Sequence, residues 1–208
     1  MTDSISDVIF SDAIRAAQTR YGSRGAIAGL EARGRWKTEI SDDVAAFIAT
    51  RDSFYLGTAS RQGRPYIQHR GGPRGFIRVL DRTTLLWPEY RGNRQYISTG
   101  NLTENAQAFI FLMDYAEQRR IKLWGRAAVV EDARSLSRPL EDVLTRTREA
   151  DFERAIRFDI EAWDENCRQY ITPRYSEAQA MHRLMEAEAT ITSLRAEIEA
   201  LKSGRIGN

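Results

Sequence analysis

Cysteine is almost absent from this chain, since its 208 residues include only Cys167. An internal disulfide is therefore excluded, and a lone thiol is typical of a protein from the reducing cytoplasm. With only two histidines, no metal site is expected. No apolar run approaches the ~18 residues of a membrane span, and the acidic N-terminus lacks a signal-peptide pattern. The sequence thus predicts a cytoplasmic protein without a membrane partner.

Charge is nearly balanced, because 31 basic residues face 29 acidic ones and the net charge is +2. This balance gives no reason to expect a nucleic-acid partner. Most of the basic residues are arginines, which bind planar oxyanions well, although a GC-rich genome explains the same bias. Neither a phosphate-binding Walker loop nor a Rossmann glycine motif nor a nucleophile elbow is present. The catalytic residues stay unknown at this point.

The N-terminal third predicts two helices separated by a connector. Apolar spacing predicts a helix over 6–21, and the glycine-rich residues 22–34 are expected to form a loop. Ser41 is a good N-cap for a second helix that ends near residue 51. The buried stripe of this helix is predicted to be Val44, Phe47 and Ile48.

The middle of the chain reads as short strands joined by short turns, which indicates antiparallel pairing. A short helix is predicted over 96–105. The six strands are expected over 54–60, 65–70, 76–80, 84–88, 107–115 and 120–130. The fold class is therefore mainly β with flanking helices (α+β), and periodicity alone leaves a barrel and a sandwich equally open.

Residues 132–137 and 140–170 are expected to be mostly helical, with Pro139 as a helix start or break. A long helix is predicted over 176–202, with apolar residues spaced alternately by four and three. These seam residues are Ala180, Leu184, Ala187, Ile191, Leu194, Ile198 and Leu201. Such a coiled-coil helix needs a partner. We favour the same helix of a second chain over a groove on its own barrel.

Two corners rich in glycine and arginine, within 66–76 and 90–102, dominate the chemistry of the chain. Glycines let the backbone approach a ligand, and backbone N–H groups with guanidinium forks suit a phosphate. The motifs are Gln68-His69-Arg70-Gly71-Gly72-Pro73, Gly75-Phe76-Ile77, Arg91-Gly92-Asn93-Arg94-Gln95-Tyr96 and Gly100-Asn101-Leu102. In this order and spacing they resemble the pyridoxamine 5′-phosphate oxidase-related FMN-binding proteins, over about residues 36–130. The resemblance implies a six-stranded split barrel, FMN as cofactor and a homodimer with the flavin at the subunit interface.

The resemblance assigns the FMN phosphate to Arg70, Arg94 and Gln95, with Asn93 and Ser98 beside them. The alternative is that these arginines are ordinary surface charges at the ends of strands. Chemistry alone favours that alternative, and the family pattern reverses the preference.

Further contacts with the flavin are expected from two strands. Gln68 and His69 lie on opposite faces of one strand, so one of them should face the barrel interior or the flavin. His69 can hydrogen-bond an isoalloxazine, but a structural role is the better expectation than catalysis. Leu86 and Trp87 either flank the isoalloxazine or belong to the core.

The last barrel strand is expected to have one unusual face. Alternation places Arg120, Lys122 and Trp124 together, with Ile121 and Leu123 on the core side. The resemblance implies that this strand completes the flavin site across the dimer interface. Arg120 or Lys122 then reaches the pyrimidine edge of the flavin, where a cation stabilises the reduced ring. The alternative is a solvated face.

Near the C-terminus the family often has a Trp-Asn-Cys-Pro-Gln-His-Ile block. Here Arg168 and Tyr170 replace its proline and histidine. A substrate other than pyridoxamine phosphate is therefore expected, also because no second phosphate cluster is evident. A haem-binding or sensor protein is the alternative function, with His69 or His182 as axial ligand. A third reading is an interaction protein that acts through its coiled coil.

The resulting prediction is an FMN-binding oxidoreductase, acting on an unidentified small molecule. It has four parts: an N-terminal helix and connector (1–35), the split barrel (36–132), a helical extension (133–175) and the C-terminal coiled-coil helix (176–208).

Overall fold

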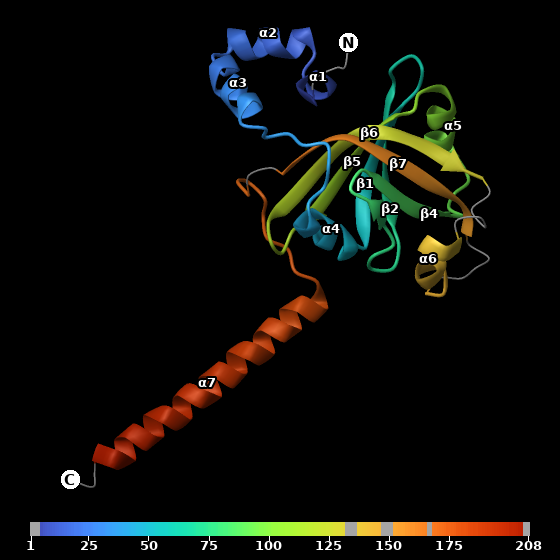
Figure 1. The fold of residues 1–208 in the computed structure, drawn as a ribbon. Helices are drawn as coiled ribbons and strands as arrows, with labels where there is room; N and C mark the ends of the chain where they lie inside the picture. Colours follow the sequence, from blue (N-terminus) through green and yellow to red (C-terminus); the bar gives the residue numbers. More distant parts are fainter. Residues whose placement is uncertain (1–4, 132–136, 147–151, 166–167, 206–208) are drawn as a thin grey trace. The chain divides into compact units, whose positions relative to one another are not determined.

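A computed structural model of the chain describes residues 5–131, 137–146, 152–165 and 168–205 (Figure 1). The chain divides into two compact units. The first contains residues 1–114 and 119–168, and the second contains residues 115–118 and 169–208. All strands belong to the first unit, and the long C-terminal helix belongs to the second.

The strands of the first unit are β1 (Ser53–Ala59), β2 (Pro65–Gly71), β3 (Arg78–Asp81), β4 (Thr84–Tyr90), β5 (Gln107–Asp114), β6 (Arg119–Val130) and β7 (Phe152–Glu165). They form one antiparallel sheet in the order β2-β1-β5-β6-β7-β4-β3, with β2 and β3 as its edges. The expected class, mainly β with flanking helices, is confirmed. The six strands predicted for the split barrel are too few, because the described part of the chain forms seven strands, and their sheet stays open.

The additional strand is β7, which lies in the segment 140–170 that we expected to be mostly helical. Its residues alternate in burial, since Ile156 and Phe158 are buried while Arg157 between them is exposed. A helix cannot bury every second residue, whereas a strand does so by its period of two. β7 pairs with both β6 and β4 and thereby joins the two halves of the sheet. Most of the other predicted helix, 132–137, lies outside the described residues.

The N-terminal segment forms three short helices, α1 (Ile5–Ile9), α2 (Asp12–Arg20) and α3 (Arg24–Ala32). The single helix predicted over 6–21 is thus two helices. Ser11 separates them and caps α2, because its Oγ accepts a hydrogen bond from the Ile14 N–H at 3.4 Å. The loop predicted over 22–34 is wrong too, since α3 occupies most of it.

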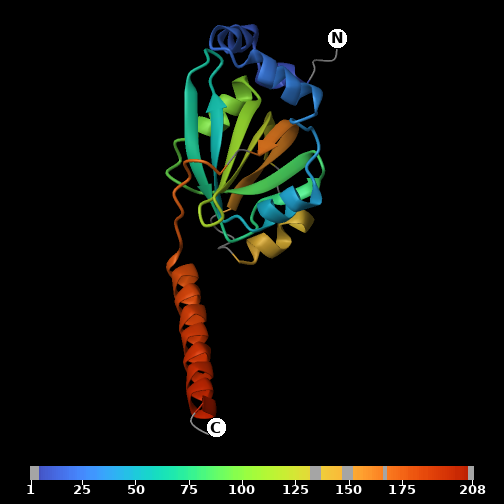
Figure 2. The same ribbon diagram turned by 90° about the vertical axis from the view of Figure 1, so that its left-hand side faces the viewer.

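Three further helices belong to this unit, α4 (Asp42–Ala49), α5 (Ile97–Glu104) and α6 (Ser137–Leu144). The prediction for α4 is confirmed: the Val44 N–H donates to Ser41 Oγ at 3.3 Å, and Val44, Phe47 and Ile48 are buried. α5 confirms the helix expected over 96–105. Figure 2 shows α4 and α6 near the same end of the strands.

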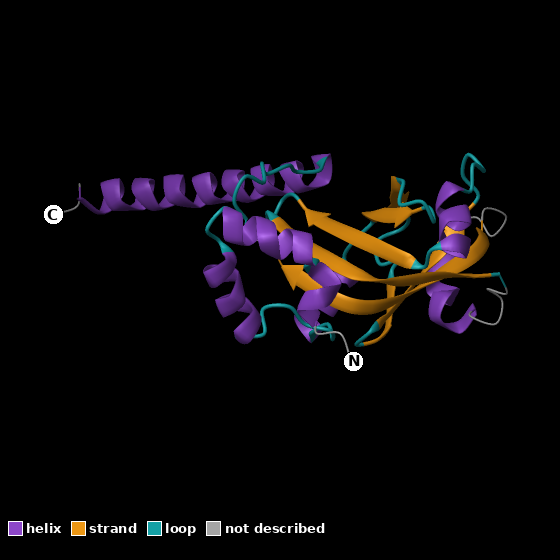
Figure 3. Ribbon diagram, turned by 90° about the horizontal axis from the view of Figure 1, so that it is seen from above, coloured by secondary structure: helices purple, strands orange, loops and turns teal. Residues whose placement is uncertain are grey.

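An aromatic cluster lies at the centre of the first unit. Trp87 of β4 meets Phe54 of β1 edge to face, with ring centroids 5.1 Å apart, and Phe76 stacks on Phe54 at 5.8 Å. β1 and β4 are far apart in the order of the sheet. Their side chains meet because the sheet curls around its own core (Figure 3).

The sheet bends at a bulge between the long strands β6 and β7. The pairing register shifts between Trp124 and Gly125. A Cβ atom at position 125 would lie 2.1 Å from the Asp159 carbonyl oxygen, so only glycine allows this approach of the two backbones. The bulge increases the local twist and helps the sheet to curl.

The second unit contains α7 (Glu177–Arg205), which confirms the helix predicted over 176–202. It begins with a reciprocal cap: the Gln179 N–H donates to Ser176 Oγ, and the Ser176 N–H donates to Gln179 Oε1. Each residue of 177–203 is exposed. The predicted coiled coil stays a prediction. Among the described residues, no helix is long and apolar enough to cross a membrane.

Candidate functional site

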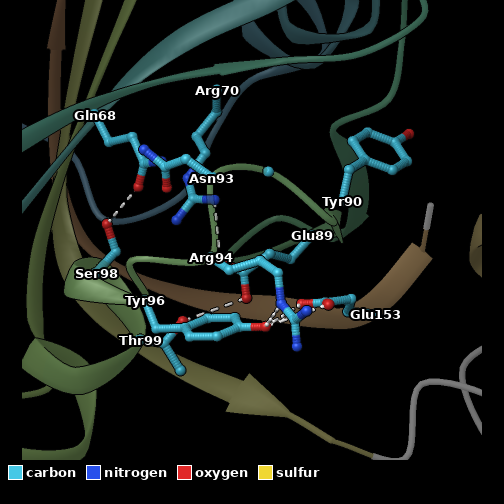
Figure 4. Close-up of a pocket in the computed structure, with 11 residues that line it drawn as sticks. Gln68, Arg70, Glu89, Tyr90, Asn93, Arg94, Tyr96, Ser98, Thr99 and Glu153 are labelled. Atoms are coloured by element: carbon cyan, nitrogen blue, oxygen red, sulfur yellow. Dashed lines mark hydrogen bonds and ion pairs between the residues drawn. The ribbon is translucent and has the colours of Figure 1, made fainter.

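A hollow is lined by side chains of β2, β4, the turn before α5, α5 itself and β7 (Figure 4). Its volume is about 330 Å³, including space open to solvent. The lining residues are Gln68, Arg70, Glu89, Tyr90, Gly92, Asn93, Arg94, Tyr96, Ser98, Thr99 and Glu153. Arg70 on β2 and Glu89 on β4 meet across the split, with Nη1 and Oε1 3.0 Å apart. A side-chain ion pair therefore joins two strands that share no backbone pairing.

The register of β2 directs two polar side chains to the inner side of the sheet. Gln68 lies opposite Leu56 and Arg70 lies opposite Phe54, and both partners on β1 are buried core residues. Directly paired residues share a face of a sheet. Ser98 Oγ, in the first turn of α5, donates to Gln68 Oε1 at 2.9 Å. This hydrogen bond links the start of α5 to the strand.

Glu89 is the more deeply buried of two carboxylates at the site, since it is only 6% exposed. One carboxylate oxygen pairs with Arg70, and the other lies 3.6 Å from Arg154 Nε of β7. Thr99 Oγ1 donates to the same oxygen at 3.4 Å. A buried carboxylate is tolerated only with such partners. Glu89 thus holds both arginines at the rim of the hollow.

Glu153 of β7 is the second carboxylate of the site that pairs with arginines. Its carboxylate accepts from Arg154 Nη2 at 2.9 Å and pairs with Arg91 Nε at 3.5 Å. The Tyr96 hydroxyl donates to it at 3.3 Å, and Arg94 Nε donates to that hydroxyl, also at 3.3 Å. This hydrogen bond is the main cause that raises the pKa of Arg94 above its usual value.

The turn that carries Arg94 has a strained backbone. Arg94 and Tyr96 have φ angles of 60° and 52°, in the left-handed region that non-glycine residues rarely occupy. Each such residue costs on the order of 1 kcal/mol or more and is retained where the surroundings hold it. Here Asn93 Oδ1 accepts a hydrogen bond from the Gln95 N–H at 3.1 Å, which fixes the turn. The turn therefore presents its side chains in one defined arrangement.

The electrostatics of the cluster favour an anion. Four guanidinium groups, those of Arg70, Arg91, Arg94 and Arg154, surround Glu89 and Glu153, and the exposed Glu131 lies 4.0 Å from Arg154, so four positive charges face three negative ones. The Nε of Arg70 is buried and has no hydrogen-bond partner. The whole side chain is only 12% exposed. A buried donor without a partner is costly, so a ligand oxygen there would satisfy it.

Five of the predicted cofactor-binding residues line this hollow: Gln68, Arg70, Asn93, Arg94 and Ser98. Gln95 lies beside them in the same turn and is exposed. Side chains of both corners therefore meet at one place in the fold. The glycines of the first corner do not line the hollow, and the N–H groups of Gly72 and Gly75 donate to backbone carbonyls instead.

Leu86 and Trp87 lie elsewhere. Their side chains are 1% and 0% exposed and belong to the hydrophobic core. Their contact with a flavin ring stays a prediction, and this burial does not support it.

Three other predicted residues lie on the opposite, outer face of the sheet. His69 is paired with Tyr55, Tyr55 with Phe111, and Phe111 with Lys122. Because directly paired residues share a face, His69 and Lys122 lie on the same side, across four strands. Arg120 follows on that face of β6, while Ile121 and Leu123 are buried, as the predicted alternation requires. We call the side of the sheet that carries His69, Tyr55, Phe111, Lys122 and Arg120 the outer face.

The cations of the outer face are partly buried. Lys122 Nζ lies 3.8 Å from Asp164 Oδ2 and 5.3 Å from the ring centroid of Trp124. Burial lowers the pKa of Lys122, although Asp164 opposes that shift. Arg120 Nε is buried without a hydrogen-bond partner. The outer face also carries aromatic surface, since Tyr55 is 39% exposed.

Sequence reasoning missed four residues of the site: Glu89, Thr99, Glu153 and Arg154. Two of them lie on β7, whose alternating pattern was the signal that could have placed them in the sheet. Glu89 lies near the end of the buried strand β4, where a carboxylate needs a buried cation. No local pattern identifies Arg70 as that cation.

The curled, open antiparallel sheet with a charged hollow beside β2 and β4 defines a split-barrel type of fold. Residues 40–167 match the family model described as pyridoxamine 5′-phosphate oxidase. The chain belongs to this family. A comparison with curated protein sequences returned no match.

One solved structure supports the fold, and two others are less similar. HupZ of Group A Streptococcus aligns with a TM-score of 0.50 and 15% identity, covering 65% of this chain and 99% of its own. An FMN-binding protein from Syntrophomonas wolfei gives 0.45 and 15%, covering 72% and 97%. HutZ, a haem storage protein from Vibrio cholerae, gives 0.43 and 18%, covering 59% and 90%. At such identities the likeness concerns the fold alone.

Proposed function

We propose that this chain is an FMN-binding flavoprotein and that the hollow receives the phosphate of the cofactor. The four clustered guanidinium groups, which outnumber the carboxylates around them, are the observation that supports this most. A phosphate monoester bears about −1.5 to −2 charges at neutral pH. Arginine forks match phosphate oxygens better than lysine does.

The residues that would hold the phosphate are Arg70 and Arg94, with the Ser98 hydroxyl and the Gln68 amide at the wall of the hollow. Arg70 offers its buried Nε–H, which has no other partner. When bound, FMN supplies the hydride or electron transfer, while the protein supplies orientation and electrostatics. These side chains thus fit the role of holding the cofactor.

Glu89 competes with a bound anion for Arg70 and so lowers the affinity of Arg70 for that anion. One Arg70 nitrogen, Nη1, is already paired with this carboxylate, and a phosphate must share or replace that pair. The affinity for phosphate should therefore be moderate.

A second chain is needed if Arg120 and Lys122 also serve the flavin. They lie on the outer face, whereas Gln68 and Arg70 point to the inner side of the same sheet. Residues on opposite faces of one sheet cannot meet a single ligand inside one chain. We therefore propose a homodimer in which the outer face of one chain completes the site of the other.

We further propose that the protein is an oxidoreductase acting on a small molecule other than pyridoxamine phosphate. Arg168 and Tyr170 stand where the family block has proline and histidine, which supports the difference in substrate. The proposed location is the cytoplasm, on the ground of the single cysteine.

The test compares FMN with riboflavin, which lacks the phosphate. We expect the purified protein to bind FMN, seen as visible flavin absorbance, and to bind riboflavin more weakly. Arg70→Met should weaken FMN binding by about tenfold to a hundredfold, as for one lost hydrogen bond to a charged group, and leave riboflavin binding unchanged. Arg64→Met is the matched control, at an exposed position in the turn before β2. Absence of bound flavin in every preparation would refute the proposal.

Haem binding is the second candidate, favoured by one observation. His69 is exposed on the outer face, with its ring 5.7 Å from that of Tyr55, and can offer an imidazole to an iron centre. A Soret band on haem addition that disappears in His69→Ala, in a preparation without flavin affinity, would establish this function in place of the first.

A further inference from the structure

The longest helix of the chain, α7, has an apolar seam that is exposed to solvent. Its large members Leu184, Ile191, Leu194, Ile198 and Leu201 are between 48% and 65% exposed. Over 29 residues the helix is about 44 Å long. A helix of this kind gains stability from packing its apolar stripe rather than from propensity alone.

The spacing of the seam assigns every position of the heptad. Leu184, Ile191 and Ile198 occupy the a positions, and Ala187, Leu194 and Leu201 occupy the d positions. In the last two heptads isoleucine stands at a and leucine at d. This combination favours two parallel strands over trimers and tetramers.

The charges that flank the seam complement one another in a parallel pair. There, a g residue faces the e residue of the following heptad on the other helix. Arg183 at g thus faces Glu188 at e, and Glu197 at g faces Lys202 at e. By symmetry each pair occurs twice, and no like charges meet.

An antiparallel pair is less well matched. In that arrangement e faces e and g faces g. If the seams are aligned end to end, Glu188 meets Arg195, but Lys202 meets Met181 and Glu197 meets Thr190. Only one of these combinations is an ion pair.

We propose that α7 binds α7 of a second copy of this chain as a parallel, in-register, two-stranded coiled coil. The seam supplies the burial, and the flanking charges set the orientation. This inference does not depend on FMN. It adds a consequence for the proposed homodimer, because a parallel coil places both first units at the same end. Tethering raises their effective concentration, so a weak contact between the two first units is sufficient.

Cysteine cross-linking of the full-length chain tests the orientation. In a Cys167→Ser background, Leu184→Cys and Leu201→Cys are each prepared alone and then mixed after dissociation. A parallel coil predicts that each variant alone forms a disulfide-linked dimer under mild oxidation. An antiparallel coil predicts cross-links only in the mixture, since positions 184 and 201 then face each other. Ala196→Cys, on the opposite side of the helix, is the control and should give only collisional background.

Charge reversal tests the pairing independently. Lys202→Glu places two like charges opposite each other on both sides of the coil and should lower the cross-linking efficiency and weaken self-association by about tenfold. The double variant Glu197→Lys with Lys202→Glu restores complementarity and should recover both. Cross-linking confined to the mixture, a cross-linked trimer or tetramer, or signals equal to the Ala196→Cys control would each overturn the proposal. Flavin content is not read in this assay, so its outcome is separate from that of the proposed function.

Discussion

Replacing Glu89 by glutamine should lower stability and at the same time raise the affinity for FMN. The carboxylate is 6% exposed and is shared between Arg70 at 3.0 Å and Arg154 at 3.6 Å. Breaking a fully buried ion pair costs about 3–5 kcal/mol. Glutamine keeps the shape and one acceptor oxygen, and Arg154 keeps Glu153, so we expect a loss of about 2 kcal/mol in the free energy of unfolding.

The gain in affinity follows from the same contacts. Without the carboxylate, the Arg70 guanidinium is free to bind a phosphate, and the excess charge around the hollow rises by one. A hydrogen bond between charged groups contributes about 1.5–3 kcal/mol, and part of this is offset by desolvation, so FMN binding should tighten by about tenfold. Riboflavin, which has no phosphate, should bind as before.

Urea unfolding and flavin titration measure the two effects separately. Glu161→Gln, on β7 and outside the hollow, is the matched control and should change the unfolding free energy by no more than about 0.5 kcal/mol. Weaker FMN binding by Glu89→Gln would show that Glu89 does not compete with the phosphate. An unchanged unfolding free energy would show that the ion pair does not stabilise the split of the barrel.

Three further predictions concern the fold. Gly125→Ala forces a Cβ to within 2.1 Å of the Asp159 carbonyl and should cost about 3 kcal/mol or more in urea unfolding, whereas Gly57→Ala, with 3.4 Å to its nearest atom, should cost less than about 1 kcal/mol. Hydrogen bonds from the β3–β4 turn lower the pKa of Asp81, so its stabilisation is present above the unfolded pKa of ~3.9 and lost as pH falls through the lower folded value. Asp81→Ala should therefore destabilise at pH 7 but not in strong acid. Ser41→Ala removes the α4 cap and should lower the thermal midpoint through a loss of about 1 kcal/mol.

Local patterns predicted most of the fold. The cap at Ser41 and the stripe of α4 were identified correctly, because capping and helical periodicity act within a few residues. The first six strands were placed to within a few residues for the same reason. β7 was missed although Ile156, Arg157 and Phe158 alternate, because the charged residues between its apolar positions also suit a helix surface.

The site was predicted only where its signals are local. The arginines of the two corners were identified, and the structure places Arg70 and Arg94 at one hollow. Their partners Glu89 and Glu153 were not identified. Each of these contacts depends on how the sheet curls, and no short segment of the sequence determines that curl. The opposite orientation of Gln68 and His69 was predictable, since it follows from the period of two.

The lack of backbone pairing between β2 and β4 has a consequence for how easily β2 opens locally. An edge strand frays more easily than an interior one, because only one side of it takes part in a hydrogen-bond ladder. Here a side-chain ion pair, Arg70 with Glu89, links β2 to β4, although these strands share no backbone pairing. An anion that binds at this ion pair would slow the exchange of β2 amide protons with solvent. Amide hydrogen exchange along β2 would therefore detect ligand binding without any optical signal.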